Sequence, residues 1–296
     1  MLQEVLARHP DVGFMSNLDV NVPRLRLMGR WNNRLYRLTP AGFGQRDRRG
    51  MGLVAGRFRF GPSEAYRLLA REVSPMLADP CRDLTEDDVT PWLELRCWRF
   101  FEARMAAQSK AVFLCKFAGW PRVRFFHRVF PQARFLHVVR DGRAVADSLM
   151  RRPWWDGHRG PSNWRLGPLP DRYQQAWEAA DRSFVALAGI HWSILMDAFH
   201  DARSRTPHAR WMEVRYEELV ERPRDVLSGI LDFAELPWTA AFEAGFARYE
   251  FSPERKDEYR TNLTTDQLRV LERTIAPGLE QLGYLAGNEG VLEDSP

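Results

Sequence analysis

The sequence predicts an α/β fold with three layers, in which helices cover both faces of a central parallel sheet. Short apolar runs typical of buried strands alternate with segments of helical spacing, and this alternation favours parallel strands joined by helices. The apolar runs lie at 12–17, 111–117, 133–140 and 209–220. A chain of 296 residues that is 45% hydrophobic can form one large domain, and no linker divides it. We therefore expect a single domain over residues 1–296.

Local sequence signals support three of the expected helices. The helical spacing of residues 1–10 stops at Pro10, and the helix expected at 62–73 is opened by Pro62 and Ser63. The helix expected at 85–108 carries acidic residues in its first turn, which is favourable for the helix dipole. The remaining expected helices are 120–130, 142–152, 171–200, 223–235, 239–248 and 265–282.

Two segments show no clear period. Residues 21–61 are rich in Arg, Gly, Asn and Trp, so we expect an irregular segment on the surface. Residues 153–170 are rich in Pro, Gly and Trp and predict a loop. Its three tryptophans, Trp154, Trp155 and Trp164, suit the wall of an acceptor pocket, and packing of the long loop itself is the alternative.

Composition narrows the function classes. The net charge of +4 is mild and suits an anionic small ligand. Of the 43 basic residues, 40 are arginines, and they are scattered along the chain, so we expect no nucleic-acid partner. Three widely spaced cysteines predict neither a metal site nor a disulfide framework. With no visible signal peptide and no apolar stretch long enough to span a bilayer, we expect a soluble, cytoplasmic protein.

The segment VVRDGRAVADSLM (138–150) predicts an anion site. Arg140 ends a strand where ligands bind in open α/β sheets, and Asp141 can cap the helix that follows. The N–H groups of that helix start favour an anion, and Ser148 lies roughly 9 Å further along the axis. The long arginine and the hydroxyl could share one phosphate. The alternative is an arginine paired with a carboxylate and a serine that faces solvent.

The wider segment KFAGWPRVRFFHRVFPQARFLHVVRDGRAVADSLM (116–150) resembles the sulfotransferase family, in particular its bacterial members. Further similar segments are HPDVGFMSNLDV (9–20), RYEELVERPRDVLSGILDFAELPW (215–238) and ERKDEYRTNLTTDQL (254–268). The resemblance implies a P-loop NTPase-like α/β/α fold and sulfuryl transfer from 3′-phosphoadenosine 5′-phosphosulfate (PAPS). It implies a hydroxyl or amine on a small-molecule, carbohydrate or lipid acceptor, and no metal.

The resemblance also assigns roles to residues. In the family, positions matching Arg140 and Ser148 bind the 3′-phosphate, and an Arg-Lys pair matching Arg255 and Lys256 grips the same group. Some members have glycine after that pair, where this chain has Asp257. A lysine matching Lys116 stabilises charge on the leaving phosphate. The alternative is that both lysines are ordinary surface charges.

The family begins with a strand and a phosphosulfate-binding loop, typically GxxRSGTTLL, and no such string occurs here. The opening MLQEVLARHP corresponds to the helix after that loop, so we expect a chain truncated relative to the family, through a mis-called start, a fragment or real loss. Real loss favours the alternative function, a catalytically impaired or inactive protein that binds PAPS or its product 3′,5′-adenosine bisphosphate (PAP). A kinase of similar architecture would need a Gly-Lys-Ser/Thr loop, which is also absent from the sequence.

The catalytic base is open on sequence alone. Some relatives carry glutamate near the position of Asn17, and an amide cannot accept the acceptor's proton. Asp19 lies next to it and is our expected base, with Glu64 as another candidate. Either carboxylate could instead be a helix cap or a surface group. His127 and His137 lie on elements expected to be buried, which is more typical of core histidines than of catalysts.

Overall fold

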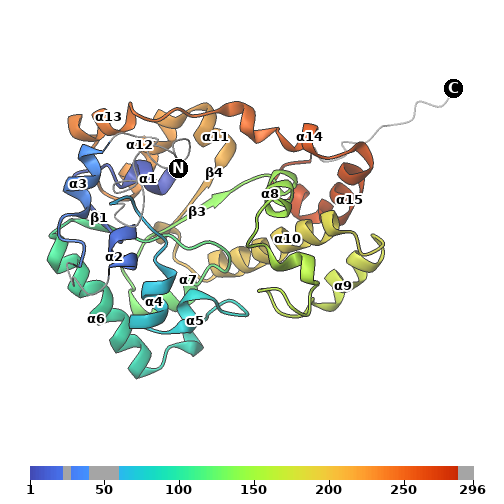
Figure 1. Ribbon diagram of the computed structural model, residues 1–296, viewed down its shortest axis with the longest axis horizontal. Helices are drawn as coiled ribbons and strands as arrows, with labels where there is room; N and C mark the ends of the chain where they lie inside the picture. The colour runs from blue at the N-terminus through green and yellow to red at the C-terminus, as the bar shows by residue number, and fades with distance from the viewer. Residues whose placement is uncertain (23–27, 40–59, 286–296) are drawn as a thin grey trace. The chain divides into compact units, whose positions relative to one another are not determined.

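The computed structural model describes residues 1–22, 28–39 and 60–285 (Figure 1). Its contacts divide the chain into two compact units, each assembled from segments far apart in sequence. The first unit contains Met1–Leu136, Arg205–Met212 and Arg222–Phe251. The second unit contains His137–Ser204, Glu213–Glu221 and Ser252–Pro296. The single domain expected over 1–296 stays a prediction.

Strands occur in all four places where apolar runs predict them. β1 (Val12–Phe14) pairs in parallel with β2 (Val112–Leu114), with Gly13 opposite Phe113. β3 (Phe135–Val139) pairs with β4 (Trp211–Arg215) in a second two-stranded sheet. The prediction of an α/β fold in which helices connect the strands is confirmed.

In the first unit, the helices between residues 66 and 129 pack around an aromatic core. Phe101 of α6 contacts Phe126 of α7 edge to face, with ring centroids 6.1 Å apart, and Leu68 and Leu69 of α4 are fully buried in the same cluster. The helices are α1 (Leu2–Leu6), α2 (Asn17–Asn21), α3 (Asn32–Leu38), α4 (Tyr66–Glu72), α5 (Pro75–Ala78), α6 (Pro91–Gln108), α7 (Val123–Val129), α12 (Pro223–Phe233) and α13 (Ala240–Phe246), with 3₁₀ turns η2 (Glu86–Asp88) and η4 (His208–Arg210).

The expectation that residues 21–61 are irregular is wrong for residues 32–38, which form α3. The error arises because Asn33 is typical of loops in sequence, whereas in the structure it is buried and hydrogen-bonded. Its side-chain amide donates to the carbonyls of Ala7, His9 and Val12, 2.8–3.1 Å away, and so fixes α3 to the turn before β1. Residues 23–27 and 40–59 of that expected segment lie outside the described residues.

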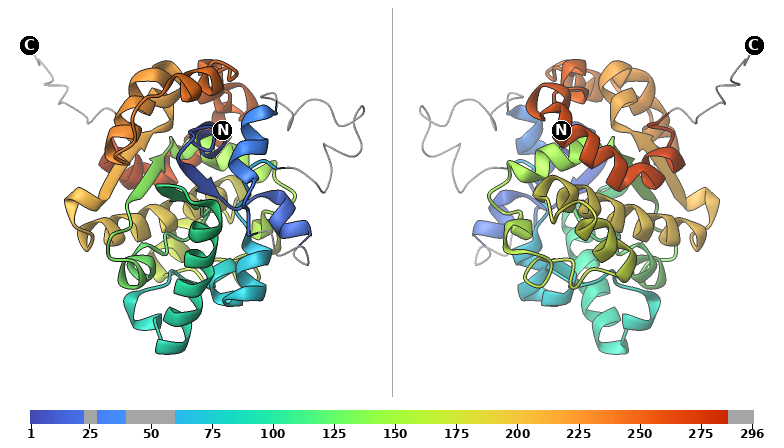
Figure 2. Two further views of the ribbon diagram at one scale, coloured as in Figure 1. Left: turned by 90° about the vertical axis from the view of Figure 1, so that its left-hand side faces the viewer. Right: turned by 90° about the vertical axis from the view of Figure 1, so that its right-hand side faces the viewer.

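Three helices of the second unit pack side by side: α8 (Gly142–Met150), α10 (Phe184–Ser204) and α15 (Thr265–Gln281) (Figures 1 and 2). Two glycines permit this approach. A Cβ on Gly142 would lie 2.7 Å from the Trp192 ring, and one on Gly189 would lie 2.5 Å from Leu271. The other helices are α9 (Asp171–Glu178), α11 (Tyr216–Glu221) and α14 (Tyr259–Asn262), with 3₁₀ turns η3 (Asp156–Arg159) and η5 (Pro253–Lys256).

The single helix expected over 171–200 is wrong, because the chain breaks between α9 and α10. Asp181 and Arg182 both adopt left-handed backbone angles, with φ of 50° and 55°. The indole of Trp177 donates to the carbonyl of Ser183 at 3.1 Å and closes this turn. Neither glycine nor proline marks the break, so the sequence carries no ordinary signal for it.

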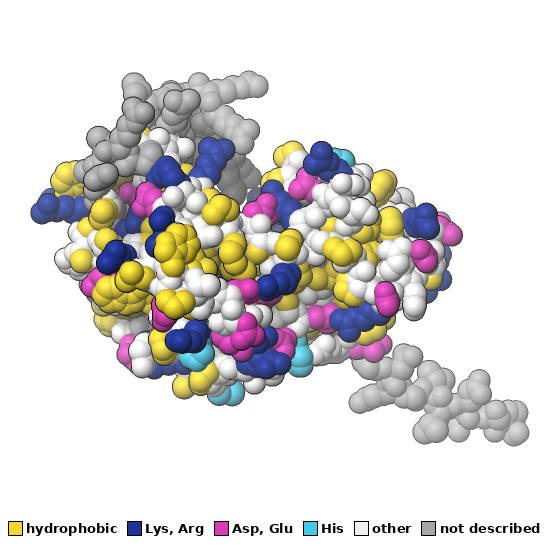
Figure 3. All heavy atoms as spheres, turned by 90° about the horizontal axis from the view of Figure 1, so that it is seen from below, with side chains coloured by type: hydrophobic (Ala, Val, Ile, Leu, Met, Phe, Trp, Pro, Cys, Tyr) yellow, Lys and Arg dark blue, Asp and Glu magenta, His cyan; other side chains and the backbone are white. Residues whose placement is uncertain are grey.

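The loop 153–170 packs two of its tryptophans into the second unit. Trp155 and Trp164 are buried, whereas Trp154 is 51% exposed. None of the described helices has the length and apolar character that a membrane span requires. On the face drawn in Figure 3, basic and acidic side chains are interspersed.

Candidate functional site

Arg140 directly follows β3 in the second unit, and its guanidinium is held by uncharged groups. Nη2 donates to the backbone carbonyl of Arg255 at 2.8 Å, and the guanidinium carbon lies 4.3 Å from the centroid of the Tyr216 ring. Its Nε is buried, without a hydrogen-bond partner in the described part of the chain. Two site residues predicted from distant segments, Arg140 and Arg255, are therefore in contact.

The short helix α11 contacts Arg140, Asp141 and Lys256 and so supports the predicted anion site. Tyr216 stacks under Arg140, and Glu221 forms an ion pair with Lys256, which raises the pKa of the Lys256 ammonium through the hydrogen bond. Glu217 accepts from the backbone N–H of Asp141 at 3.0 Å. Sequence analysis missed the roles of these α11 residues, although the segment RYEELVE itself was singled out.

Asp141 caps α8 as predicted. Its carboxylate accepts from the backbone N–H of Arg143 at 2.8 Å and is gripped by the Arg143 guanidinium at 2.7 Å. Arg143 also bonds Glu272 of α15 at 2.6 Å. These contacts fix the start of α8 directly after Arg140, so the backbone at the predicted anion site is well supported.

Ser148 lies on α8, is partly exposed, and makes no side-chain hydrogen bond with the described residues. Its neighbour Asp147 accepts from Asn262 of α14 at 3.0 Å. This bond ties α8 to the helix that follows Lys256. Joint binding of one phosphate by Ser148 and Arg140 stays a prediction.

In the first unit, the structure brings two predicted candidates together. The Lys116 ammonium lies 2.5 Å from a carboxylate oxygen of Glu64, and both side chains are partly exposed. The loop after Lys116 is fixed by Tyr66, whose hydroxyl donates to the Ala118 carbonyl at 3.1 Å and accepts from the Ala118 N–H. Burial raises the pKa of Tyr66 to about 12, so this hydroxyl stays protonated at neutral pH.

Asp19 serves as a helix cap at the start of α2. Its Oδ2 accepts from the N–H of Ser16 at 2.8 Å, from the hydroxyl of Ser16 at 2.9 Å and from the amide of Asn32 at 2.6 Å. All three bonds fall on one oxygen. A structural role is therefore established for Asp19, and its role as a base stays a prediction.

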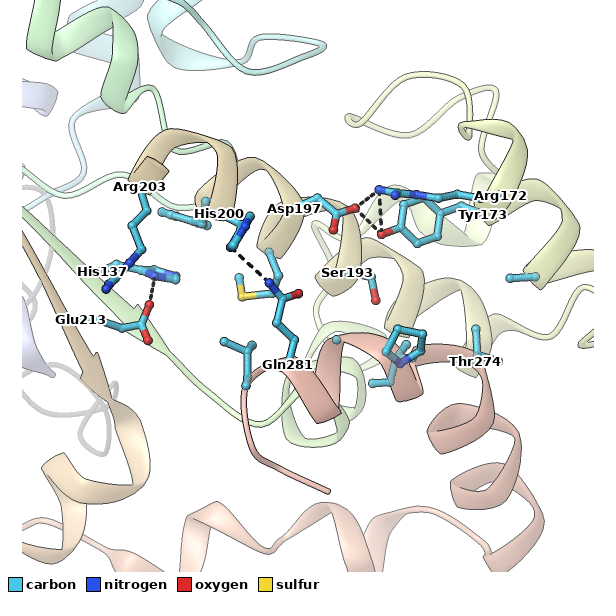
Figure 4. Close-up of a pocket in the computed structure, with 17 residues that line it drawn as sticks. His137, Arg172, Tyr173, Ser193, Asp197, His200, Arg203, Glu213, Thr274 and Gln281 are labelled. Carbon is cyan, nitrogen blue, oxygen red and sulfur yellow. Dashed lines mark hydrogen bonds and ion pairs between the residues drawn. The ribbon is translucent and has the colours of Figure 1, made fainter. Parts of the chain in front are cut away.

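A cavity of about 280 Å³ in the second unit is lined by none of the predicted site residues. Figure 4 shows His137 facing Glu213 at one end and Arg172 and Tyr173 converging on Asp197 at the other. His137 is buried and stacks on Phe199 with ring centroids 3.9 Å apart. This packing agrees with the expectation that His137 is a core histidine.

No group of three or more His, Cys, Asp or Glu side chains within 1–22, 28–39 and 60–285 is arranged to hold a metal ion. The expectation of metal-free chemistry stays a prediction.

Comparison with known proteins identifies the family. Residues 1–240 match the model of the sulfotransferase family. The chain is 25% identical over 199 residues to the omega-hydroxy-beta-dihydromenaquinone-9 sulfotransferase Stf3 of Mycobacterium bovis, covering 64% of this chain and 47% of Stf3. It is 27% identical over 113 residues to a Drosophila melanogaster protein-tyrosine sulfotransferase, covering 38% of this chain and 18% of that protein.

The chain thus spans about half the length, or less, of the curated relatives it matches. Its fold is similar to the crystal structure of sulfotransferase STF9 from Mycobacterium avium, with a TM-score of 0.55 and 17% identity over 95% of this chain and 72% of that one. The family match over most of the chain and the likeness in fold agree with the resemblance carried by residues 116–150. The chain belongs to the sulfotransferase family.

Proposed function

We propose that this chain transfers a sulfuryl group from PAPS to a hydroxyl or amine of an acceptor. The observation that carries the proposal is the contact between Arg140 and the loop of Arg255 and Lys256. This contact brings the backbone of a loop with two further basic residues next to Arg140, at the end of β3, and such a set of cations suits a phosphate.

The residues present fit the 3′-phosphate of PAPS. Arg140 has a buried Nε without a partner in the described residues, and Arg255 is exposed beside it. A guanidinium offers two parallel donors to a phosphate, and Ser148 on α8 would add a hydroxyl. Lys256 would contribute once its ammonium leaves Glu221. PAPS, when bound, supplies the sulfuryl group and a phosphate as leaving group.

Lys116 is the proposed electrophilic residue. Its ammonium would hold positive charge against the bridging oxygen as the sulfur–oxygen bond to the leaving phosphate breaks. Asp19 or Glu64 would take the proton that the acceptor loses as its oxygen or nitrogen bonds to sulfur. Because Glu64 already contacts Lys116, one residue pair could supply both electrostatic stabilisation and proton transfer.

The acceptor class we propose is a small molecule, a carbohydrate or a lipid. The names of the relatives include a dihydromenaquinone sulfotransferase and a protein-tyrosine sulfotransferase, so the family acts on chemically different acceptors. A cytoplasmic location is part of the proposal, and it is supported by three cysteines that are all free thiols.

Two measurements test the proposal. Isothermal titration with PAP measures nucleotide binding, and transfer of radiolabelled sulfate from PAPS onto a panel of phenols, sugars and hydroxylated lipids measures catalysis. Binding together with transfer is the expected result. Binding without transfer would instead support the alternative of a catalytically impaired nucleotide-binding protein, and absence of PAP binding contradicts both.

A further inference from the structure

Another cavity, of about 340 Å³, lies in the first unit, and many of its lining residues are arginines. The lining residues are Arg8, Arg34, Arg37, Leu38, Ala241, Ala244, Gly245 and Arg248. Half of them are arginines and none is acidic. Arginine stays protonated in proteins, so the charge of this lining does not depend on pH in the physiological range.

Two of the four arginines have a structural role at the end of α3. Arg8 is fully buried, and its Nη1 donates to the carbonyls of Tyr36 and Thr39 at 2.6 Å each. Arg248 donates from Nη1 to the carbonyls of Arg37 and Thr39 at 3.0 Å each. Cations at a helix C-terminus satisfy its last carbonyls and its dipole, which explains why these two guanidiniums are here.

The other two arginines have no such explanation. Arg34 and Arg37 lie three positions apart on α3, so they share a face of the helix. Neither side chain forms a hydrogen bond or ion pair with a described residue, and the described residues that line the cavity include no carboxylate to balance them. Clustered guanidiniums repel one another, and a bound polyvalent anion removes that repulsion.

The α13 residues that line the cavity leave room for such an anion. Ala241, Ala244 and Gly245 are among the smallest residues, so little of the space is filled by side chains. A Cβ on Gly245 would lie 2.7 Å from Cβ of Arg8, so the backbone of α13 packs directly against that arginine. The volume lies near the lower end of ligand pockets, about 300–1,000 Å³, and suits a phosphorylated or sulfated group.

We propose that the cavity of Arg34, Arg37 and Arg248 binds a phosphate- or sulfate-bearing anion with at least two negative charges. The guanidinium forks of Arg34 and Arg37 and the remaining donors of Arg248 bind its oxygens, and Arg8 forms the fixed wall. The site is separate in its residues from the nucleotide site proposed above. Its ligand is either a free anion such as a diphosphate or the phosphate headgroup of a lipid, and both present the same chemistry.

The test uses the full chain and two probes at low ionic strength: sodium pyrophosphate by isothermal titration, and phosphatidic acid vesicles by co-sedimentation. The double variant Arg34→Gln/Arg37→Gln should weaken binding of whichever probe the wild type binds by at least tenfold. The matched control Arg182→Gln/Arg269→Gln removes two exposed arginines elsewhere and should change binding by less than twofold. Both pairs lie on the surface, and thermal melting verifies that each variant is folded.

Pyrophosphate could also occupy the nucleotide site, so Arg140→Ala is titrated in parallel. The inference is overturned if Arg140→Ala abolishes pyrophosphate binding while Arg34→Gln/Arg37→Gln retains it. It is equally overturned if the wild type binds neither probe or if the control pair loses as much affinity as the cavity pair. Failure of PAP binding alone contradicts the proposed function and leaves this inference standing.

Discussion

The two units hold their predicted cations in different ways. In the first unit, the Lys116 ammonium lies against the Glu64 carboxylate, so its charge is already neutralised. In the second unit, the Arg140 guanidinium is held by a backbone carbonyl and an aromatic ring, neither of which carries a net charge. An anion reaching Arg140 gains the full charge interaction, whereas one reaching Lys116 first displaces a carboxylate.

This difference suggests a division of work. A cation whose charge is not cancelled suits ground-state binding of a phosphate. A cation paired with a carboxylate suits a role in which its charge is needed when new negative charge develops, because the pair then rearranges. Lys256 is also paired with a carboxylate, that of Glu221, so we expect it to contribute less than Arg140 to binding of the 3′-phosphate.

The largest effect should come from the first unit. Replacing Lys116 by alanine should lower kcat for sulfuryl transfer by about 100-fold, because an electrostatic donor to the leaving group is lost. PAP affinity should stay within about twofold, since Lys116 is assigned to the transition state. Steady-state kinetics with PAPS and calorimetry with PAP measure the two quantities.

Lys110→Ala is the matched control, because Lys110 precedes β2 and forms no ion pair with a residue that the structure describes. Glu64→Gln distinguishes a role of Glu64 as the catalytic base from a role as the ion-pair partner of Lys116. A base gives a pH–rate profile that loses its acidic limb in the variant, whereas a mere partner of Lys116 leaves that limb in place. Equal loss of kcat and PAP affinity in Lys116→Ala would remove the contrast between the units.

The second effect concerns binding in the second unit. Arg140→Ala should weaken PAP binding at least tenfold, about 1.4 kcal/mol, whereas Lys256→Ala should weaken it only a few-fold because Glu221 already cancels that charge. Titration calorimetry of both variants gives the ratio. Arg269→Ala, which removes a side chain that is 71% exposed, serves as the control. A larger loss from Lys256→Ala than from Arg140→Ala would reverse our ordering.

The sequence predicted the strands well because buried strands are read from short apolar runs, which local chemistry determines. It failed at Asp181 and Arg182, whose left-handed backbone is stabilised by a tertiary contact of Trp177 rather than by glycine. It also failed at α3, where Asn33 reads as a loop residue and its buried bonds reach back to Ala7 and Val12. Such contacts join residues that no local pattern connects.

The candidate site shows the same limit. The spacing of Arg140 and Ser148 predicts an anion site, yet the contact with Arg255 spans 115 residues and was expected only through the family resemblance. The supporting residues on α11 were not found from the sequence. The contacts of Tyr216 with Arg140 and of Glu221 with Lys256 are visible only in three dimensions. Asp19 was interpreted as a base, although its spacing from Ser16 also fits the capping box that the structure contains.

The third prediction concerns the pH dependence of stability, which should have opposite sign for one buried group in each unit. In the first unit, burial raises the pKa of Asp83 to about 6, so the folded state binds its proton more tightly than the unfolded state. Stability from Asp83 therefore rises as pH falls from 7 to 5. In the second unit, burial lowers the pKa of His191 to about 4, so the unfolded state binds that proton more tightly and stability falls below pH 6.5.

Both effects should be on the order of 1–2 kcal/mol between pH 7 and 5, with opposite sign. Urea unfolding at several pH values measures them in Asp83→Asn and His191→Gln. As pH falls from 7 to 5, Asp83→Asn should gain less stability than wild type does. His191→Gln should lose less stability than wild type does. Parallel pH profiles for wild type and both variants would show that neither group titrates as its burial requires.

The smallest effect tests whether Glu221 competes with the proposed ligand. Glu221→Gln removes the carboxylate that holds Lys256, so PAP binding should tighten by about two- to fivefold at low salt, the small effect expected of an exposed ion pair. The gain should shrink as ionic strength rises, because exposed charges are screened. Glu254→Gln removes an exposed acid in the same loop and should tighten binding less. If Glu221→Gln instead weakens binding, then the carboxylate positions Lys256 for the phosphate, and the neutralised lysines of the two units do not behave alike.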